Sequence, residues 1–389
     1  MTPDTSLLDR PVVNAAQSMT RIHWLWVGGV AGLMLLRLAM SWLLLNDVPR
    51  LPSHDGWYWR SGGDQALYFQ IAQSFVAGTP LNKSVSVGLS LLMAGVIKLT
   101  QADDFRDILP WLVILNGFVL AALSVWVMAQ LTYGLTRSRW QALTAAAIWT
   151  LSPYGLWLAF GFHREAETLR DVYVSLQLWM KVLTDPPSLF TAMLGILLVV
   201  LGVEADGQKN RRWQREILFG LGGLSLGLAA SLRFQTLAMS GMIGIALLWN
   251  RQWRGLALVC AGFLAGFSPQ LWYNAAVAGH VLNMPYISGW LGFRSDGSFI
   301  FDRRSMQFSP QFFVDSLIFV ARRQWVLALV GCLAVVIFAY VVAQCRRRRG
   351  SFAALVMFGV PVASLGLHIV TYVFAIDPIR FSLPALSLS

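Results

Sequence analysis

The chain has 389 residues, of which 56% are hydrophobic and only 13% are charged. A soluble domain is about 45–50% apolar and about 25% charged, so this composition excludes an ordinary water-soluble globule and indicates a protein embedded in lipid. The net charge of +11 does not indicate a nucleic-acid partner, because the Lys and Arg residues form short clusters between apolar runs, as in inward-facing loops of membrane proteins.

The first 21 residues are polar and are expected to form a cytoplasmic tail. The apolar run 22–45 is too long for a signal-peptide core and no small-residue cleavage site follows it, so it is predicted to be an uncleaved signal anchor. Further runs that approach the length needed to cross a bilayer are 110–133, 140–160, 187–203, 215–232, 235–250, 254–275, 324–344 and 352–376. The chain stops at Ser389 in what looks like the opening turn of one more helix.

These runs predict an all-α polytopic membrane protein with about 9–11 transmembrane helices, in which residues 22–389 form a single membrane module. The predicted topology depends on whether the shorter apolar stretch 85–100 crosses the membrane. If it does not cross, the basic clusters at 137–139, 209–215, 251–254 and 346–349 all face the cytoplasm, in agreement with the positive-inside rule. Residues 85–100 are therefore expected to form a re-entrant or interfacial helix, and the outer face is expected to carry the loops 46–109, 161–186 and 276–323, where the acidic residues concentrate.

The first candidate site follows the anchor helix. From Asp64 onward, Tyr68, Ile71, Ala72 and Phe75 recur at helical spacing, which predicts an amphipathic helix on the outer membrane surface with Asp64 near its N-terminus. A carboxylate at that position can cap the helix or can act as a general base, and the residues alone leave both roles open.

The second candidate is the mixed-charge segment 161–171, which contains His163, Glu167 and Asp171. Such a cluster at a membrane boundary is commonly a solvated helix end. Two acidic segments on the same face can also converge over one cavity at the membrane surface, where carboxylates activate hydroxyl nucleophiles. No His, Cys and Asp spacing indicates a dedicated metal site, no cofactor is implied, and a divalent metal has no support.

Arginines near or within the apolar runs form the third candidate, because a charge inside a bilayer is costly. Arg37 lies late in the first run, where its side chain could snorkel to the interface. Arg233 lies at a turn between two apolar runs, and Arg380 follows the last full run on the expected outer side. Arginine is well suited to holding a phosphate at the membrane edge.

Several degenerate motifs follow one another in a specific order. They are Asp64-Gln65-Ala66-Leu67-Tyr68 with Gly78 and Pro80, the apolar segment 88–99, Leu169-Arg170-Asp171, Leu232-Arg233, Pro269 and Tyr273-Asn274 with Gly279, and Arg380-Phe381 with Pro384. In this order the chain resembles the GT-C glycosyltransferases, membrane enzymes that take a sugar from a polyprenyl-phosphate carrier. Within them it is most similar to the protein mannosyltransferase and aminoarabinose transferase-like group.

The resemblance implies an inverting sugar transfer on the outer face of a bacterial inner membrane, from a polyprenyl-phosphate-linked sugar to a hydroxyl of a glycan, lipid or protein. In this reading Asp64 is the base, and Asp171 or Glu167 orients the acceptor or the base. The lipid phosphate would be held by Arg233, Arg380 and Arg294. The acceptor and the sugar would be contacted by residues of three separate outer segments, namely Tyr68, His163, Tyr286 and Trp290.

Two other functions stay open. A transporter or flippase of lipid-linked sugars is expected to contain polar, broken helices at the midplane, often in paired halves, whereas here few mid-helix polar residues other than Ser and Gln occur and no internal symmetry is visible. A non-catalytic subunit of a membrane complex is the other alternative, because Asp64 is followed by Gln65 where many members of the group carry Asp-Glu.

Overall fold

The computed structural model describes residues 12–43, 45, 54–55, 58–59, 63–81, 83, 85–161, 182–205, 212–286, 289–293, 299–300, 339–340, 343 and 351–369. The described part is mainly helical. Its helices are α1 (Val12–Leu43), α2 (Gly63–Val76), α3 (Gly88–Thr100), α4 (Phe105–Val113), the π-helix η1 (Ile114–Leu120), α5 (Ala121–Thr136), α6 (Arg139–Gly161), α8 (Asp185–Glu204), α9 (Arg212–Leu232), the 3₁₀-helix η4 (Phe234–Thr236), α10 (Leu237–Trp249), α11 (Trp253–Ala278) and α14 (Ser351–Ile369).

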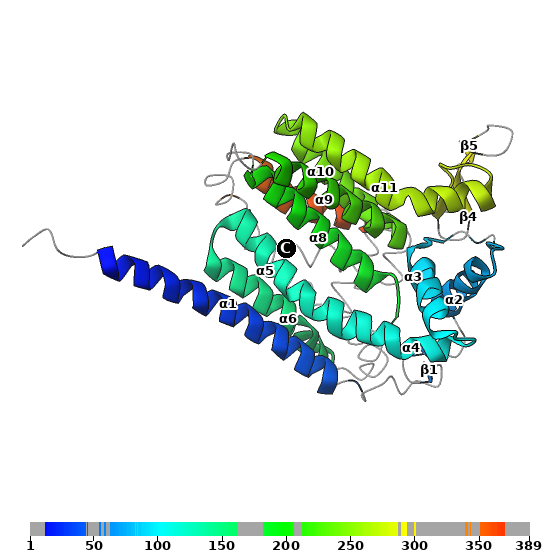
Figure 1. Ribbon diagram of the computed structural model, residues 1–389, viewed down its shortest axis with the longest axis horizontal. Helices are drawn as coiled ribbons and strands as arrows, with labels where there is room; N and C mark the ends of the chain where they lie inside the picture. Colours follow the sequence, from blue (N-terminus) through cyan, green and yellow to red (C-terminus); the bar gives the residue numbers. More distant parts are fainter. Residues whose placement is uncertain are drawn as a thin grey trace, which may run out of the picture.

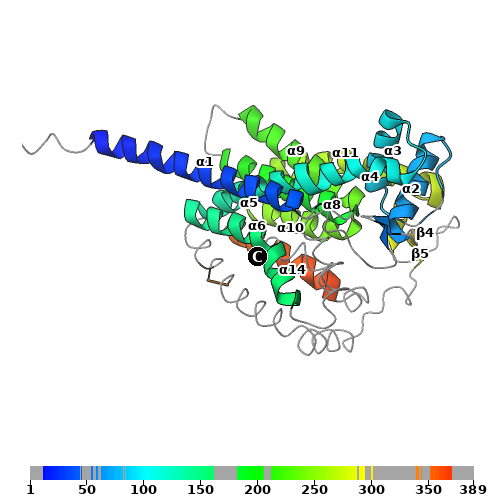
Figure 2. The ribbon, with the colours of Figure 1, turned by 90° about the horizontal axis from the view of Figure 1, so that it is seen from below.

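Short strands accompany the helices. Strand β1 (His54–Asp55) pairs antiparallel with β2 (Tyr58–Trp59), and β3 (Met284–Tyr286) pairs with β4 (Gly289–Phe293), which pairs with β5 (Phe299–Ile300). All of them lie at the same end of the molecule as α2 and α3 (Figures 1 and 2). The strands therefore lie at one end of a helical bundle.

The long helices run roughly alongside one another. Helix α1 lies beside α5 and α6, α8 lies between α5 and α9, and α11 lies against α9 (Figure 1). Helix α14 packs on α10 on the other side of the bundle, which is seen best in Figure 2. The first part of α1 extends beyond the other helices.

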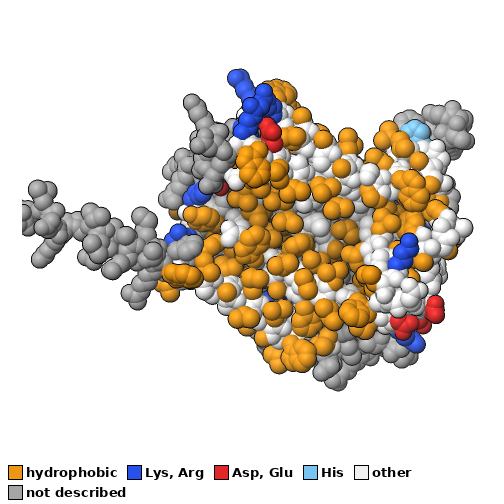
Figure 3. Space-filling model, viewed as in Figure 1, with side chains coloured by type: hydrophobic (Ala, Val, Ile, Leu, Met, Phe, Trp, Pro, Cys, Tyr) orange, Lys and Arg blue, Asp and Glu red, His pale blue; other side chains and the backbone are white. Residues whose placement is uncertain are grey.

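Within the described part of the chain, five helical segments are long and apolar enough to cross a membrane: Trp24–Leu43, Phe105–Thr136, Asp185–Glu204, Arg212–Leu232 and Trp253–Val277. Twenty residues of α-helix span about 30 Å, the thickness of a bilayer's hydrocarbon core. Figure 3 shows hydrophobic side chains across the middle of one face, with charged side chains gathered toward its edges. The described helices are thus compatible with a membrane protein, as the composition predicted.

The described helix ends that flank the basic clusters meet at one end of the bundle, which we call the basic end. The Arg137 guanidinium after α5 forms a 2.6 Å ion pair with Glu204 at the end of α8. The ring of Phe219 in α9 packs against both Gly202 of α8 and Gly255 of α11, so the end of α8, the start of α9 and the start of α11 lie at the same level. The charge pattern of the sequence predicted this grouping of helix ends, while residues 206–211 and the cluster 346–349 lie outside the described residues.

The opposite end, which we call the acidic end, carries α2, α3, the start of α4 and the strands (Figure 1). Helix α3 has 13 residues and spans about 20 Å, too little to cross a bilayer. The polar turn 101–104 then leads directly into α4. This geometry supports the prediction that residues 85–100 do not cross the membrane.

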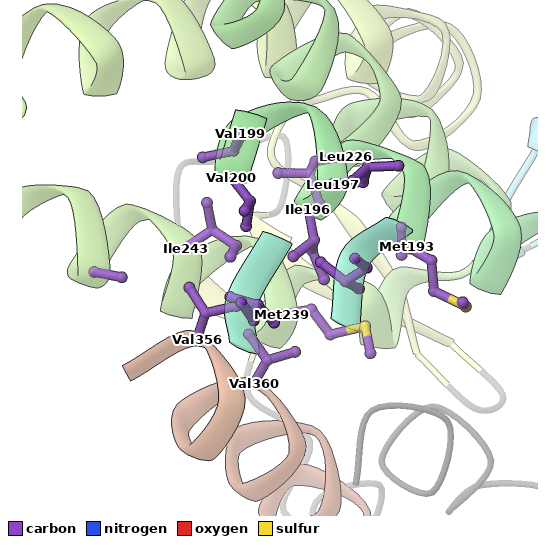
Figure 4. Close-up of a cluster of buried hydrophobic side chains, with 14 of the residues drawn as sticks. Met193, Ile196, Leu197, Val199, Val200, Leu226, Met239, Ile243, Val356 and Val360 are labelled. Carbon is purple, nitrogen blue, oxygen red and sulfur yellow. The ribbon is translucent and has the colours of Figure 1, made fainter. Parts of the chain in front are cut away.

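Buried hydrophobic side chains form the core between α5, α8, α9, α10, α11 and α14. Figure 4 shows the centre of this cluster, where Met193 and Ile196 from α8 meet Leu226 from α9, Met239 and Ile243 from α10, and Val356 and Val360 from α14. Because these helices contribute to a single cluster, they form one packed unit.

Glycines allow α9 and α11 to pack almost backbone to backbone. A Cβ atom on Gly223 would lie 2.1 Å from the Val259 carbonyl oxygen, and one on Gly262 would lie 2.1 Å from the Gly220 carbonyl oxygen. Gly227 and Gly266 make equally close approaches one turn further along. Small residues are the usual means of close helix packing in a membrane, where burial from water cannot drive helix association.

Candidate functional site

Asp64 lies in the first turn of α2 and is exposed at the acidic end. Its carboxylate is therefore close to the positive end of the helix dipole. The other face of the helix is buried, with Ile71 and Ala72 fully enclosed and Tyr68 and Phe75 partly so. The predicted helix, with Asp64 in its first turn and one buried face, is confirmed. Its position on the outer membrane surface stays a prediction, and the choice between a capping and a catalytic role stays open.

The buried face of α2 rests on Tyr273 of α11. Tyr273 is completely buried and forms one apolar cluster with Ile71 of α2 and Val87, the residue before α3. Its ring meets the ring of Phe75 edge to face, with centroids 5.8 Å apart. The helix that carries Asp64 is thus supported by a side chain far along the chain.

The Tyr273 hydroxyl also holds the backbone between α2 and α3. Its oxygen lies 2.6 Å from the Leu81 carbonyl oxygen and 2.8 Å from the Lys83 carbonyl oxygen, and it accepts a 3.2 Å hydrogen bond from the Lys83 N–H. A phenol has a single proton, so it donates to one of the two carbonyls at a time. One turn earlier in α11, the side-chain oxygen of Gln270 accepts from the Val87 N–H at 2.9 Å.

A third side chain completes this set. The Gln270 amide donates to Asn274 Oδ1 at 2.8 Å, and the Asn274 amide donates to the Val281 carbonyl oxygen at 3.1 Å, beyond the end of α11. Gln270, Tyr273 and Asn274 are each at most 1% exposed, so their hydrogen bonds form away from water. We call these three residues the latch, because they connect the end of α11 to the α2–α3 connection and to the loop after α11.

Arg233 forms a buried ion pair with Asp185. Asp185 is the first residue of α8 and Arg233 follows the last residue of α9, and their side chains are only 8% and 4% exposed. Beside them, a Cβ atom on Gly88 would lie 2.7 Å from the Leu232 backbone nitrogen, so α3 begins in contact with the end of α9. For the predicted contact between Arg233 and a lipid phosphate, this ion pair would have to open.

Polar groups also lie within the membrane-crossing region. Arg37 is 1% exposed and donates to the Thr150 carbonyl oxygen in α6 at 3.3 Å, so its side chain does not reach the surface as snorkelling would require. It lies six residues before the end of α1, or about 9 Å along the helix axis. One turn later, Ser41 donates to the Gly117 carbonyl oxygen in the π-helix η1 at 2.7 Å. The neighbouring Asn116 is 1% exposed, and its side-chain oxygen has no hydrogen-bond partner among the described residues.

Other acidic residues at this end have a local structural role. Asp104 caps α4 by accepting from the Arg106 N–H at 3.0 Å, and the Asp107 side chain accepts from the Asp104 N–H at 3.2 Å, which completes a capping box. Gln73 of α2 donates to the Asp103 carbonyl oxygen at 3.1 Å and so ties α2 to the same turn. No group of three or more metal-ligating side chains gathers anywhere in the described residues.

The remaining predicted site residues are placed only in part. Tyr286 and Trp290 lie on adjacent strands, where Trp290 pairs with Pro285 and Tyr286 pairs with Gly289. The structure describes the backbone of these strands and not their side chains. Five further candidates lie outside the described residues: His163, Glu167, Asp171, Arg294 and Arg380. Of the predicted catalytic and phosphate-binding residues, the structure therefore describes Asp64 and Arg233, both at the acidic end.

Sequence reasoning missed the partners that shape this end. Asp185 precedes two prolines at the start of a helix, so on its own it looked like one more exposed acid. Gln270, Tyr273 and Asn274 lie in an apolar run with the i, i+3, i+4 spacing of one helix face. That spacing of polar side chains near the end of a membrane helix is a signal that could have indicated a buried hydrogen-bonding set.

Comparison with known proteins gives no match: no family model, no curated protein and no solved structure is significantly similar to this chain.

Proposed function

We propose that the protein transfers a sugar from a polyprenyl-phosphate carrier to a hydroxyl acceptor at the acidic end of the bundle. The observation that carries the proposal is the position of Asp64. It is an exposed carboxylate in the first turn of a helix too short to cross the membrane, held at one end of a bundle of membrane-length helices. A base in this position can reach an aqueous acceptor and a lipid donor together.

The proposed reaction needs one base and one site for a leaving phosphate. Asp64 removes the proton of the acceptor hydroxyl, and the oxygen forms a bond to the anomeric carbon as the bond from that carbon to the phosphate oxygen breaks. The sugar inverts, and the carrier leaves as a lipid phosphate whose negative charge needs fixed positive charge nearby. Arg294 and Arg380 are the proposed ligands of that phosphate, and Arg233 joins them only if it leaves Asp185. Asp171 or Glu167 orients the acceptor.

The architecture supports the proposal in two ways. Helix α2 is fixed by apolar packing on Tyr273 and by the Gln73 hydrogen bond to the 101–104 turn, so the Asp64 carboxylate is carried by a well-supported element. A preorganised base does not have to be ordered during the reaction. The polyprenyl chain of the donor would lie against the apolar outer face of the bundle, which Figure 3 shows across the middle of the molecule.

One observation favours a transporter or flippase as the second candidate. Arg37 and Asn116 are buried polar side chains within apolar helices long enough to cross a membrane. Asn116 lies in the π-helix η1, which interrupts the α-helical hydrogen-bond pattern between α4 and α5. Buried ionisable residues and broken helices are typical of pathways through a membrane. A non-catalytic subunit of a membrane complex is the third candidate, and the test below separates it from the first.

The test is sugar transfer by the purified protein in lipid bilayers from a panel of radiolabelled polyprenyl-phosphate sugars. We expect transfer by the wild type, and a loss of at least about a hundredfold in Asp64→Asn, since a positioned general base contributes about 10²–10⁴-fold. Asp103→Asn, an exposed acid at the same end, is the matched control and should transfer normally. Absence of transfer from every donor by the folded wild type would reject the proposal, and movement of lipid-linked sugar between leaflets would favour the flippase.

A further inference from the structure

We infer that Gln270 and Tyr273 are positioning residues for Asp64. They hold the connection between α2 and α3 in place, and this connection in turn fixes the helix that carries Asp64. This inference rests on the proposed function for the role of Asp64, while the mechanical link itself is independent of that role. It gives a purpose to a buried hydrogen-bonding set that no step of the reaction uses.

The first part of the argument is what Tyr273 contacts. Its ring supports Ile71 and Phe75 on the buried face of α2, and its hydroxyl contacts the backbone at Leu81 and Lys83, just beyond the end of that helix. One side chain therefore fixes both the side of α2 and the chain that leaves it. Asp64 lies on the same helix, two turns before Ile71, so a displacement of α2 on this support moves the carboxylate as well.

The second part is where the other end of the connection is fixed. Gln270 accepts from the Val87 N–H, and the next residue, Gly88, lies against the backbone of Leu232. Residues 81–87 are thus held at both ends by α11, and the beginning of α3 is placed on the end of α9. The connection has no regular secondary structure of its own among its described residues, so side chains hydrogen-bond to its backbone: Tyr273 and Gln270 from α11, and Ser74 of α2, whose hydroxyl accepts from the Leu81 N–H at 3.2 Å.

The third part is that the contacts are made to backbone atoms. The hydrogen bonds are made to the carbonyl and N–H groups of Leu81, Lys83 and Val87. Such a set defines the path and the length of the connection, and the Val87 side chain adds an apolar contact in the Tyr273 cluster. This is the arrangement expected of a positioning device, and it differs from a ligand site, whose donors and acceptors would point toward an open space.

The variant Tyr273→Phe separates the two functions of the side chain, because it keeps the ring under α2 and removes the hydroxyl. The matched control is Tyr133→Phe, the same chemical change at the basic end, where the ring packs against Trp26. Gln270→Leu is a second variant that removes only the hydrogen bond to Val87 and the bond to Asn274.

The first measurement is hydrogen–deuterium exchange of the peptide that covers residues 79–88, in the full-length protein in lipid. We expect exchange to rise about three- to tenfold in Tyr273→Phe and in Gln270→Leu, the range that corresponds to losing one buried hydrogen bond. It should stay unchanged in Tyr133→Phe. Unaltered exchange in both latch variants, with folding intact, would overturn the inference whether or not the protein is a transferase.

The second measurement is steady-state sugar transfer. If the latch positions Asp64, kcat falls about tenfold or more in Tyr273→Phe while KM for the lipid donor stays within twofold, because a small misplacement of a base affects the chemical step. A loss of stability alone would lower the amount of active protein and leave kcat per folded molecule unchanged, which would contradict a positioning role. If the wild type transfers no sugar but the exchange changes appear, the proposed function has failed and the mechanical link stands.

Discussion

The ion pair between Asp185 and Arg233 offers the most quantitative test of how the acidic end is held together. Both side chains are less than one tenth exposed, so solvent does not screen them. Removing one partner leaves the other charge buried, which costs about 3–5 kcal/mol in soluble proteins. We therefore expect Asp185→Asn and Arg233→Gln each to lower the free energy of unfolding by about 3 kcal/mol or more.

The double variant should be much less damaging than the sum of the single ones. Burying two charges costs a large desolvation free energy, and their mutual attraction offsets only part of it. Replacing both partners with uncharged side chains is therefore often close to neutral. For Asp185→Asn with Arg233→Gln we expect a loss of about 1–2 kcal/mol and thus a coupling energy of several kcal/mol.

The assay is reversible unfolding in mixed micelles of the two single variants, the double variant and the wild type. A matched control is Arg212→Gln at the basic end, where the ion pair with Glu216 is mostly exposed and should contribute at most about 0.5 kcal/mol. Additive single effects, with a coupling energy below about 0.5 kcal/mol, would show that the pair does not hold α8 to α9 and would refute the reasoning.

Three further predictions follow from the packing. Gly223→Ala should destabilise the protein by about 1–3 kcal/mol in the same unfolding assay, because its Cβ would overlap the Val259 carbonyl oxygen, whereas Gly220→Ala on the same helix meets no atom within 4 Å and should be neutral or slightly stabilising. Cysteines replacing Arg137 and Glu204 should be joined in membranes by a flexible bis-maleimide reagent about as long as the two side chains that they replace, seen as a shift in gel mobility; no cross-link would contradict the shared basic end. Asn116→Leu should be neutral or stabilising in thermal unfolding, since its side-chain oxygen is buried without a hydrogen bond in the described structure, and a clear loss of stability would mean that the side chain has a structural partner.

The helices were predictable because their signal is local. The apolar runs 140–160, 187–203 and 254–275 correspond to α6 (Arg139–Gly161), α8 (Asp185–Glu204) and α11 (Trp253–Ala278), each within three residues at either end. Length and hydropathy decide whether a segment can span a bilayer, and both can be read from a short window of sequence. The basic clusters then predicted that the end of α5, the end of α8, the start of α9 and the start of α11 lie together.

The site was less predictable because it depends on contacts between distant segments. Asp64 could be placed at the start of α2 from the spacing of its neighbours, but the Tyr273 hydroxyl contacts Leu81 across 192 positions of sequence. Likewise, no local pattern pairs Asp185 with Arg233, which looked available for a phosphate when read alone. The π-helix η1 was also missed, because the apolar run that contains it fits an α-helix equally well.

The central claim is that Asp64 acts as the base toward an acceptor hydroxyl, and the most direct test compares acceptors of increasing acidity. The measurement is the single-turnover rate of sugar transfer to a series of matched alcohols by the wild type and by Asp64→Asn. A general base matters less as the acceptor loses its proton more easily, so the defect of the variant should shrink steadily along the series. A defect of constant size for every alcohol, or none at all, would contradict the account and would leave Asp64 the role of a helix cap.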